Sequence, residues 1–158
     1  MTNLDPLRRP AGPMPRGQAG PVVAELALRT DALNVRRARE FVVDTLRRWQ
    51  AEAGLSVDLD DASLVVSELA TNSVRYDGDE FVVRVCADEQ SVWIEVHDRS
   101  AGVPVPMVVG NEAENGRGLA IVRSLSRRSG VTATSFGKTV WAVLLEAQSP
   151  LVDRSSLN

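Results

Sequence analysis

A chain of 158 residues has the length of one domain, and its apolar content of 44% fits a globular core. The formal net charge of −3 disfavours non-specific nucleic-acid binding, and no apolar run approaches the roughly 20 residues that a membrane helix needs. The single cysteine, Cys86, excludes an internal disulfide and a multi-cysteine metal site.

The first twenty residues are rich in proline and glycine and have hardly any apolar periodicity, which predicts a disordered arm over residues 1–20. Within this arm, Arg8-Arg9 is followed by Pro10 and not by the apolar segment of a secretion signal. We therefore expect a cytoplasmic protein that does not bind a membrane. The folded domain should span residues 21–148, followed by a flexible tail over residues 149–158.

An apolar run predicts the first strand at Val22–Leu28. A cap at Thr30-Asp31 and a helical stripe of apolar residues then predict a helix from Ala32 to Ala53, which ends at Gly54. A second helix should begin after a cap at Asp60 or Asp61 and end near Tyr76, where Asp77-Gly78 makes a turn.

Alternating apolar residues predict a hairpin of strands at Phe81–Ala87 and Val92–His97. After an irregular segment over residues 99–116, a third helix is expected at Arg117–Arg128, ended by Gly130 as its C′ glycine. The last hairpin should turn at Gly137-Lys138, between strands over residues 131–136 and 139–145. This order predicts an α+β fold, a two-layer sandwich with three helices on one face of a mixed, mostly antiparallel sheet.

Glu68 and Asn72 lie four residues apart on the second predicted helix, so they share one face. An amide oxygen suits Mg²⁺, which keeps several waters, and a carboxylate one turn away can take a proton from an attacking hydroxyl. The alternative is a polar edge where the helix meets solvent. Asp98, at the end of a strand, can accept a hydrogen bond from the amino group of adenine, or it can simply initiate a turn.

Gly116 and Gly118 stand where the third helix begins, and bare backbone N–H groups at a helix N-terminus favour phosphate. Arg117 between them can add a charge-assisted contact to a phosphate or a substrate. The alternative is an ordinary helix start with Asn115 as its cap.

Taken in chain order, four segments resemble the motifs of the GHKL (Bergerat-fold) ATPases, and among them the small anti-sigma-factor serine kinases and related actinobacterial regulators. The resemblance covers about residues 22 to 147. The four segments are the N box over residues 68–76, the first glycine box over residues 96–102, the second over residues 116–122 and the closing hairpin over residues 137–142.

This resemblance implies ATP and Mg²⁺ as ligands, with Glu68 as the general base and Asn72 as the Mg²⁺ ligand. Adenine would be bound by Asp98, with Gly102 shaping its pocket and Thr139 joining the network on the adenine side. The phosphates would lie at the start of the third helix, whose nucleotide-binding residues are Gly116, Arg117, Gly118 and Leu119.

The resemblance further implies a protein-serine kinase that phosphorylates an anti-sigma-factor antagonist (the anti-anti-sigma factor), binds a sigma factor in alternation, and forms a homodimer. The alternative is a nucleotide-gated binding module that sequesters either partner without phosphorylating it. It is favoured by a short lid between Pro104 and Asn115 that holds no lysine.

Three arginine pairs, at Arg36-Arg37, Arg47-Arg48 and Arg127-Arg128, allow two interpretations. They are solvated helix faces and helix C-terminal turns, or they form a patch for an acidic protein partner. Direct nucleic-acid binding through these pairs is disfavoured by the acidic balance of the chain.

Overall fold

The computed structural model describes residues 22–75, 79–88, 91–99, 115–135 and 137–145. The predicted arm over residues 1–20, the predicted turn at Asp77-Gly78, the predicted tail and Gly102 lie outside the described residues, as does the predicted lid apart from Asn115.

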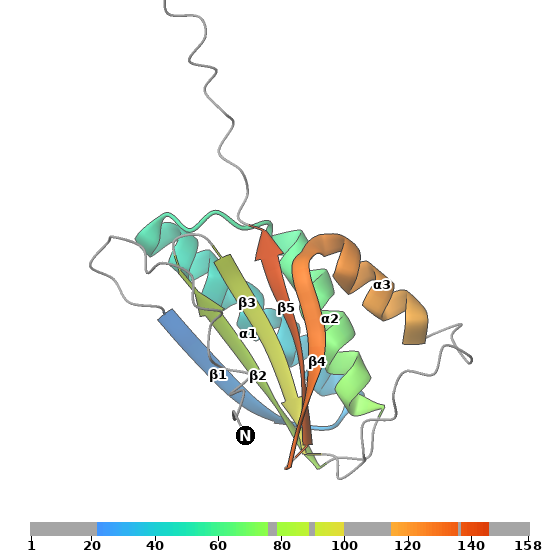
Figure 1. Ribbon diagram of the computed structural model, residues 1–158. Coiled ribbons are helices and arrows are strands. Elements are labelled where there is room, and N and C mark those ends of the chain that lie inside the picture. Colours follow the sequence, from blue (N-terminus) through green and yellow to red (C-terminus); the bar gives the residue numbers. More distant parts are fainter. Residues whose placement is uncertain (1–21, 76–78, 89–90, 100–114, 136, 146–158) are drawn as a thin grey trace, which may run out of the picture.

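The described elements follow the predicted order of strands and helices (Figure 1). They are β1 (Val22–Arg29), α1 (Ala32–Ala53), α2 (Leu59–Val74), β2 (Glu80–Ala87), β3 (Ser91–Asp98), α3 (Asn115–Leu125), β4 (Ser126–Thr134) and β5 (Gly137–Leu145). The strands form one sheet in the order β1-β2-β3-β5-β4, and every described pair is antiparallel. The predicted α+β sandwich is confirmed, but its sheet is antiparallel in the described residues and not mixed.

The core lies between the sheet and the helices, because alternate strand residues point toward the helical layer. Phe81, Val83, Ile94 and Val96 are fully buried on that face, and they meet the apolar stripes of α1 and α2. Helix α2 is central, since it contacts α1, α3 and three of the strands. In the described residues, no helix is both long and apolar enough to cross a membrane.

The bounds of α1 match the prediction. The Asp31 carboxylate accepts a hydrogen bond from the Leu33 N–H, and Gly54 ends the helix in the left-handed conformation at φ 66°. The cap of α2 was predicted at Asp60 or Asp61, and this prediction is wrong. Asp58 is the cap, because its side chain accepts from the N–H groups of both of those residues.

The end of α3 also differs from the prediction. The helix ends at Leu125 and β4 begins at Ser126, so Gly130 is a strand residue and not a helix C′ glycine. Gly130 pairs with Trp141, and a Cβ on Gly130 would lie 2.7 Å from the indole ring. The lack of a side chain at Gly130 therefore allows the indole ring to pack closely against the neighbouring strand.

The last hairpin likewise turns earlier than predicted, because Gly137 and Lys138 are the first residues of β5. Gly137 has φ 144° and lies against the end of β3, where a Cβ would overlap the carbonyl oxygen of Asp98. Only glycine fits this close backbone approach.

Replacing the α2 cap tests the corrected helix start. Asp58→Ala should lower the free energy of unfolding by about 1 kcal/mol, because two N–H groups lose their acceptor. Asp60→Ala, in the first turn of the same helix, is the control and should have a smaller effect. Urea denaturation followed by circular dichroism measures both. An equal or larger loss in Asp60→Ala would contradict the assigned cap.

Candidate functional site

The predicted site residues come from segments that meet at one end of the domain (Figure 1). The C-terminal half of α2, the end of β3, the start of β5 and the start of α3 all lie there. Helix α2 contacts β3, β5 and α3, so it forms the shared wall of this end.

Glu68 of α2 lies directly against Gly118 of α3. A Cβ on Gly118 would overlap Oε2 of Glu68 and lie 3.3 Å from its Cδ. The carboxylate therefore occupies the space that any other residue at position 118 would fill. Both residues are half-buried, so the carboxylate is held between two helices and keeps some access to solvent.

Asn72 lies one helical turn after Glu68 and is also half-buried. The next residue, Ser73, is fully buried, and its Oγ has no hydrogen-bond partner in the described part of the chain. Buried hydroxyls nearly always have a partner, so Ser73 has the capacity for one further hydrogen bond. Sequence reasoning missed Ser73, although a hydroxyl in the buried stripe of α2 is a signal that could have identified it.

Asp98 is fully buried at the end of β3 and shares the helix-facing side with Phe81 and Lys138, its register partners on β2 and β5. Nζ of Lys138 lies 3.7 Å from Oδ2 of Asp98. Burial lowers the pKa of the Lys138 ammonium, and the negative charge of Asp98 opposes this shift. The buried carboxylate thus has a cation beside it, which sequence reasoning did not assign to the site.

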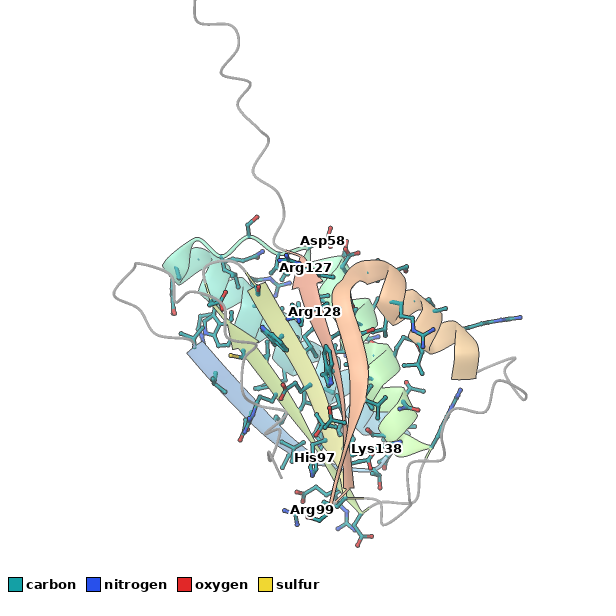
Figure 2. All side chains as sticks on the ribbon, in the orientation of Figure 1. Asp58, His97, Arg99, Arg127, Arg128 and Lys138 are labelled. Atoms are coloured by element: carbon teal, nitrogen blue, oxygen red, sulfur yellow. The ribbon has the colours of Figure 1, made fainter. Side chains whose placement is uncertain are left out.

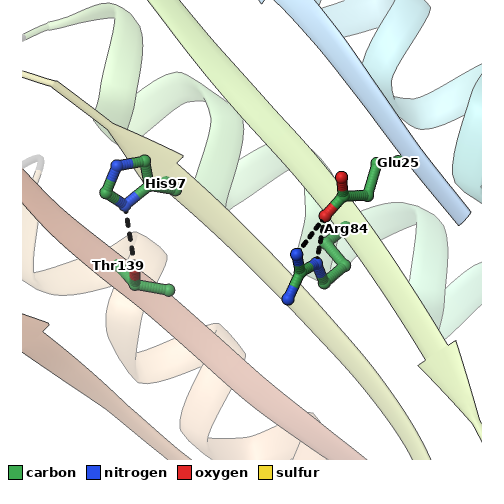
Figure 3. Close-up of polar contacts among 4 residues, drawn as sticks. All are labelled: Glu25, Arg84, His97 and Thr139. Carbon is green, nitrogen blue, oxygen red and sulfur yellow. Dashed lines mark hydrogen bonds and ion pairs between the residues drawn. The ribbon is translucent and has the colours of Figure 1, made fainter. Parts of the chain in front are cut away.

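Thr139 lies on the opposite face of the sheet from Asp98. Its Oγ1 is 3.0 Å from Nδ1 of His97, its register partner on β3 (Figure 3). The ion pair of Glu25 with Arg84 lies on the same open face. Thr139 therefore faces away from the side of the sheet on which Asp98 is buried, and its part in an adenine-side network stays a prediction.

The start of α3 contains the predicted phosphate-binding residues. The helix begins at Asn115, one residue before Gly116, so both glycines lie in its first turn. Arg117 is exposed, whereas Leu119 is half-buried and packs against the core. Leu119 thus anchors the helix, and the first-turn N–H groups remain available because they have no partners within the helix.

The arginine pairs lie on α1 and β4, not on the elements that hold the predicted site residues. Arg36 forms an ion pair with Glu40, and Arg47 forms one with Asp44, all on the exposed face of α1. Figure 2 shows Arg127 and Arg128 at the opposite end from Lys138 and His97. These two arginines are strand residues of β4, not a helix C-terminal turn, and Arg128 lies 5.7 Å from the ring centre of Trp93.

Comparison with known proteins identifies the family to which the sequence belongs. The sequence matches the histidine kinase-like ATPase domain over residues 28–144. The fold is similar to the crystal structure of the RsbU and RsbW domains of Rv1364c from Mycobacterium tuberculosis, with a TM-score of 0.56 and 21% sequence identity. That match covers 83% of this chain and 34% of the other, so the chain spans about a third of that structure.

A comparison with curated proteins gave no match. The family match covers most of the chain and includes each of α1, α2, α3 and the sheet from the end of β1 to β5. The chain belongs to the histidine kinase-like ATPase family.

Proposed function

We propose that the protein is an ATP-binding regulatory protein-serine kinase, which phosphorylates an anti-sigma-factor antagonist and sequesters a sigma factor. The observation that carries this proposal is the contact of Glu68 with Gly118, beside Asn72 and at the same end of the domain as Asp98. Membership of a family of ATPase domains supports ATP as the nucleotide. The sequence motifs and the fold similarity to a structure that contains an RsbW domain support the class of partner.

The described residues fit a magnesium-bound adenine nucleotide. The Asn72 amide oxygen would hold Mg²⁺, and the first-turn N–H groups of α3 would bind the phosphates. Gly118 has no side chain to block them. Asp98 would accept a hydrogen bond from the adenine amine.

In the proposed reaction, a serine oxygen of the antagonist attacks the γ-phosphorus and the bond to the β–γ bridging oxygen breaks, so that ADP leaves. Glu68 takes the serine proton, and the N–H groups of α3 orient the phosphates. When bound, Mg²⁺ would neutralise phosphate charge. Most of the rate enhancement would come from positioning and electrostatic stabilisation by α2 and α3.

A second candidate function is a nucleotide-gated binding module that sequesters a sigma factor or antagonist without phosphorylating it. The absence of lysine between Pro104 and Asn115 favours it, because a lysine there could hold the phosphates during transfer. It predicts partner binding that responds to ATP with no phosphoserine product. Homodimer formation remains a prediction for either function, and sedimentation tests it.

Replacing the proposed base separates nucleotide binding from transfer. Glu68→Ala should keep Mg·ATP affinity within about threefold while phosphoryl transfer falls by roughly 10²–10⁴-fold. Calorimetry measures binding, and radiolabelled ATP measures transfer to serine in the proteins that co-purify with the chain. Asn72→Ala is the control variant, since it should lose Mg²⁺-dependent nucleotide affinity itself. Equal transfer by the wild type and Glu68→Ala would refute the assigned base.

A methyl group at position 118 should displace the Glu68 carboxylate without unfolding the protein. Gly118→Ala is expected to keep or raise the unfolding temperature, because alanine favours a helix and the overlapped atom ends a flexible side chain. Transfer should fall by about 10- to 100-fold because the carboxylate is misplaced. Arg123→Ala, an exposed change on the same helix, should alter neither quantity. Unchanged transfer in Gly118→Ala would show that this contact does not position the base.

A further inference from the structure

The chain has a single lysine, Lys138, and seventeen arginines. Arginine is therefore the ordinary cation of this sequence. An arginine presents a broad planar fork, while a lysine ammonium is a compact charge whose donors can rotate. The one position that departs from arginine lies beside the buried carboxylate of Asp98.

The backbone fixes Lys138 in this place. The backbone of Gly137 lies close to the carbonyl oxygen of Asp98, and the strand register then places Lys138 opposite Asp98. The side chain of Lys138 is 13% exposed and that of Asp98 is fully buried. An ammonium has several donors and a carboxylate several acceptor sites, so each group can bind more than one partner at a time. The two groups can therefore bind a third group while they remain paired.

The stability of the fold alone does not explain why Lys138 and Asp98 form this ion pair. Taking two charges out of water opposes their attraction, and a buried ion pair often stabilises no better than apolar residues of the same volume. Burial does lower the pKa of Lys138, as expected when desolvation of the ammonium outweighs its attraction to Asp98. The pair also lies at the end of the sheet where the proposed nucleotide residues meet.

We propose that Lys138 and Asp98 together read one edge of the adenine base. Asp98 accepts a hydrogen bond from the exocyclic amine, and Lys138 donates one to a ring nitrogen beside that amine. Adenine presents this donor and acceptor side by side. The inference rests on the proposed function and deepens it, because it makes Lys138 a specificity-determining residue of the same site.

Adenine nucleotides that lack one ring nitrogen test the proposal. Calorimetry would compare Mg·ATP with its 1-deaza and 7-deaza analogues on the wild type and on Lys138→Met. The wild type should bind one of the two analogues about tenfold more weakly than ATP, which is the effect of losing one hydrogen bond to a charged donor. Lys138→Met should bind ATP about as weakly as that analogue and should no longer discriminate between them.

Arg47→Met removes the same charge from the exposed face of α1 and should leave all three affinities unchanged. If the wild type binds Mg·ATP but Lys138→Met discriminates against the analogues as the wild type does, the inference is wrong while the proposed function stands. If the wild type binds no Mg·ATP, the proposed function fails and this inference fails with it.

A second measurement uses the wild-type protein, without a substitution in the site. Because Lys138 is the only lysine, acylation of its ε-amine can be followed by peptide mass spectrometry on the wild type. Saturating Mg·ATP should slow this acylation by at least about tenfold, since the amine would be bound to the base. Lys138→Arg controls for assignment because it should give no acylated peptide over β5. Acylation at an unchanged rate with the nucleotide bound would overturn the inference.

Discussion

The contact of the Glu68 carboxylate with the backbone of Gly118 is the constraint on which the site depends. It fixes the separation of α2 and α3, because no side chain at position 118 keeps them apart. A carboxylate from one helix is thereby held at the N-terminal turn of another, whose N–H groups have no partners within that helix. The proposed proton acceptor and the N–H groups proposed to bind phosphate are thus brought together by packing before any ligand arrives.

A second close approach, between Gly137 and the end of β3, organises the other half of the site. It sets the register that brings Lys138 opposite Asp98, and alternation along β5 then turns Thr139 to the open face. Both halves use a missing Cβ to bring separate elements into contact. Helix α2 joins them, since it packs against α3 on one side and the central strands on the other.

The sequence predicted those parts of the fold that local chemistry decides. The cap at Asp31, the left-handed Gly54 and the alternation of β3 are all encoded within a few residues, and they were predicted correctly. The errors concern features set by distant partners. Gly130 follows a helical stripe and looks like a C′ glycine, but its lack of a side chain makes room for the indole of Trp141 across the sheet. Asp58, Asp60 and Asp61 are all good caps, and only the fold selects the first of them.

The same distinction applies to the site. Glu68, Asn72, Asp98 and Gly118 could be proposed from the sequence because their motifs can be read there. Lys138 and Ser73 could not, because only the fold shows their burial and register. Hydrogen exchange with and without saturating Mg·ATP tests the central claim most directly. The account predicts slower amide exchange in three separate segments, at the end of α2, at the β3–β5 pairing around Asp98 and Lys138, and at the start of α3. Slowing confined to one of these segments, or to none of them, would contradict it.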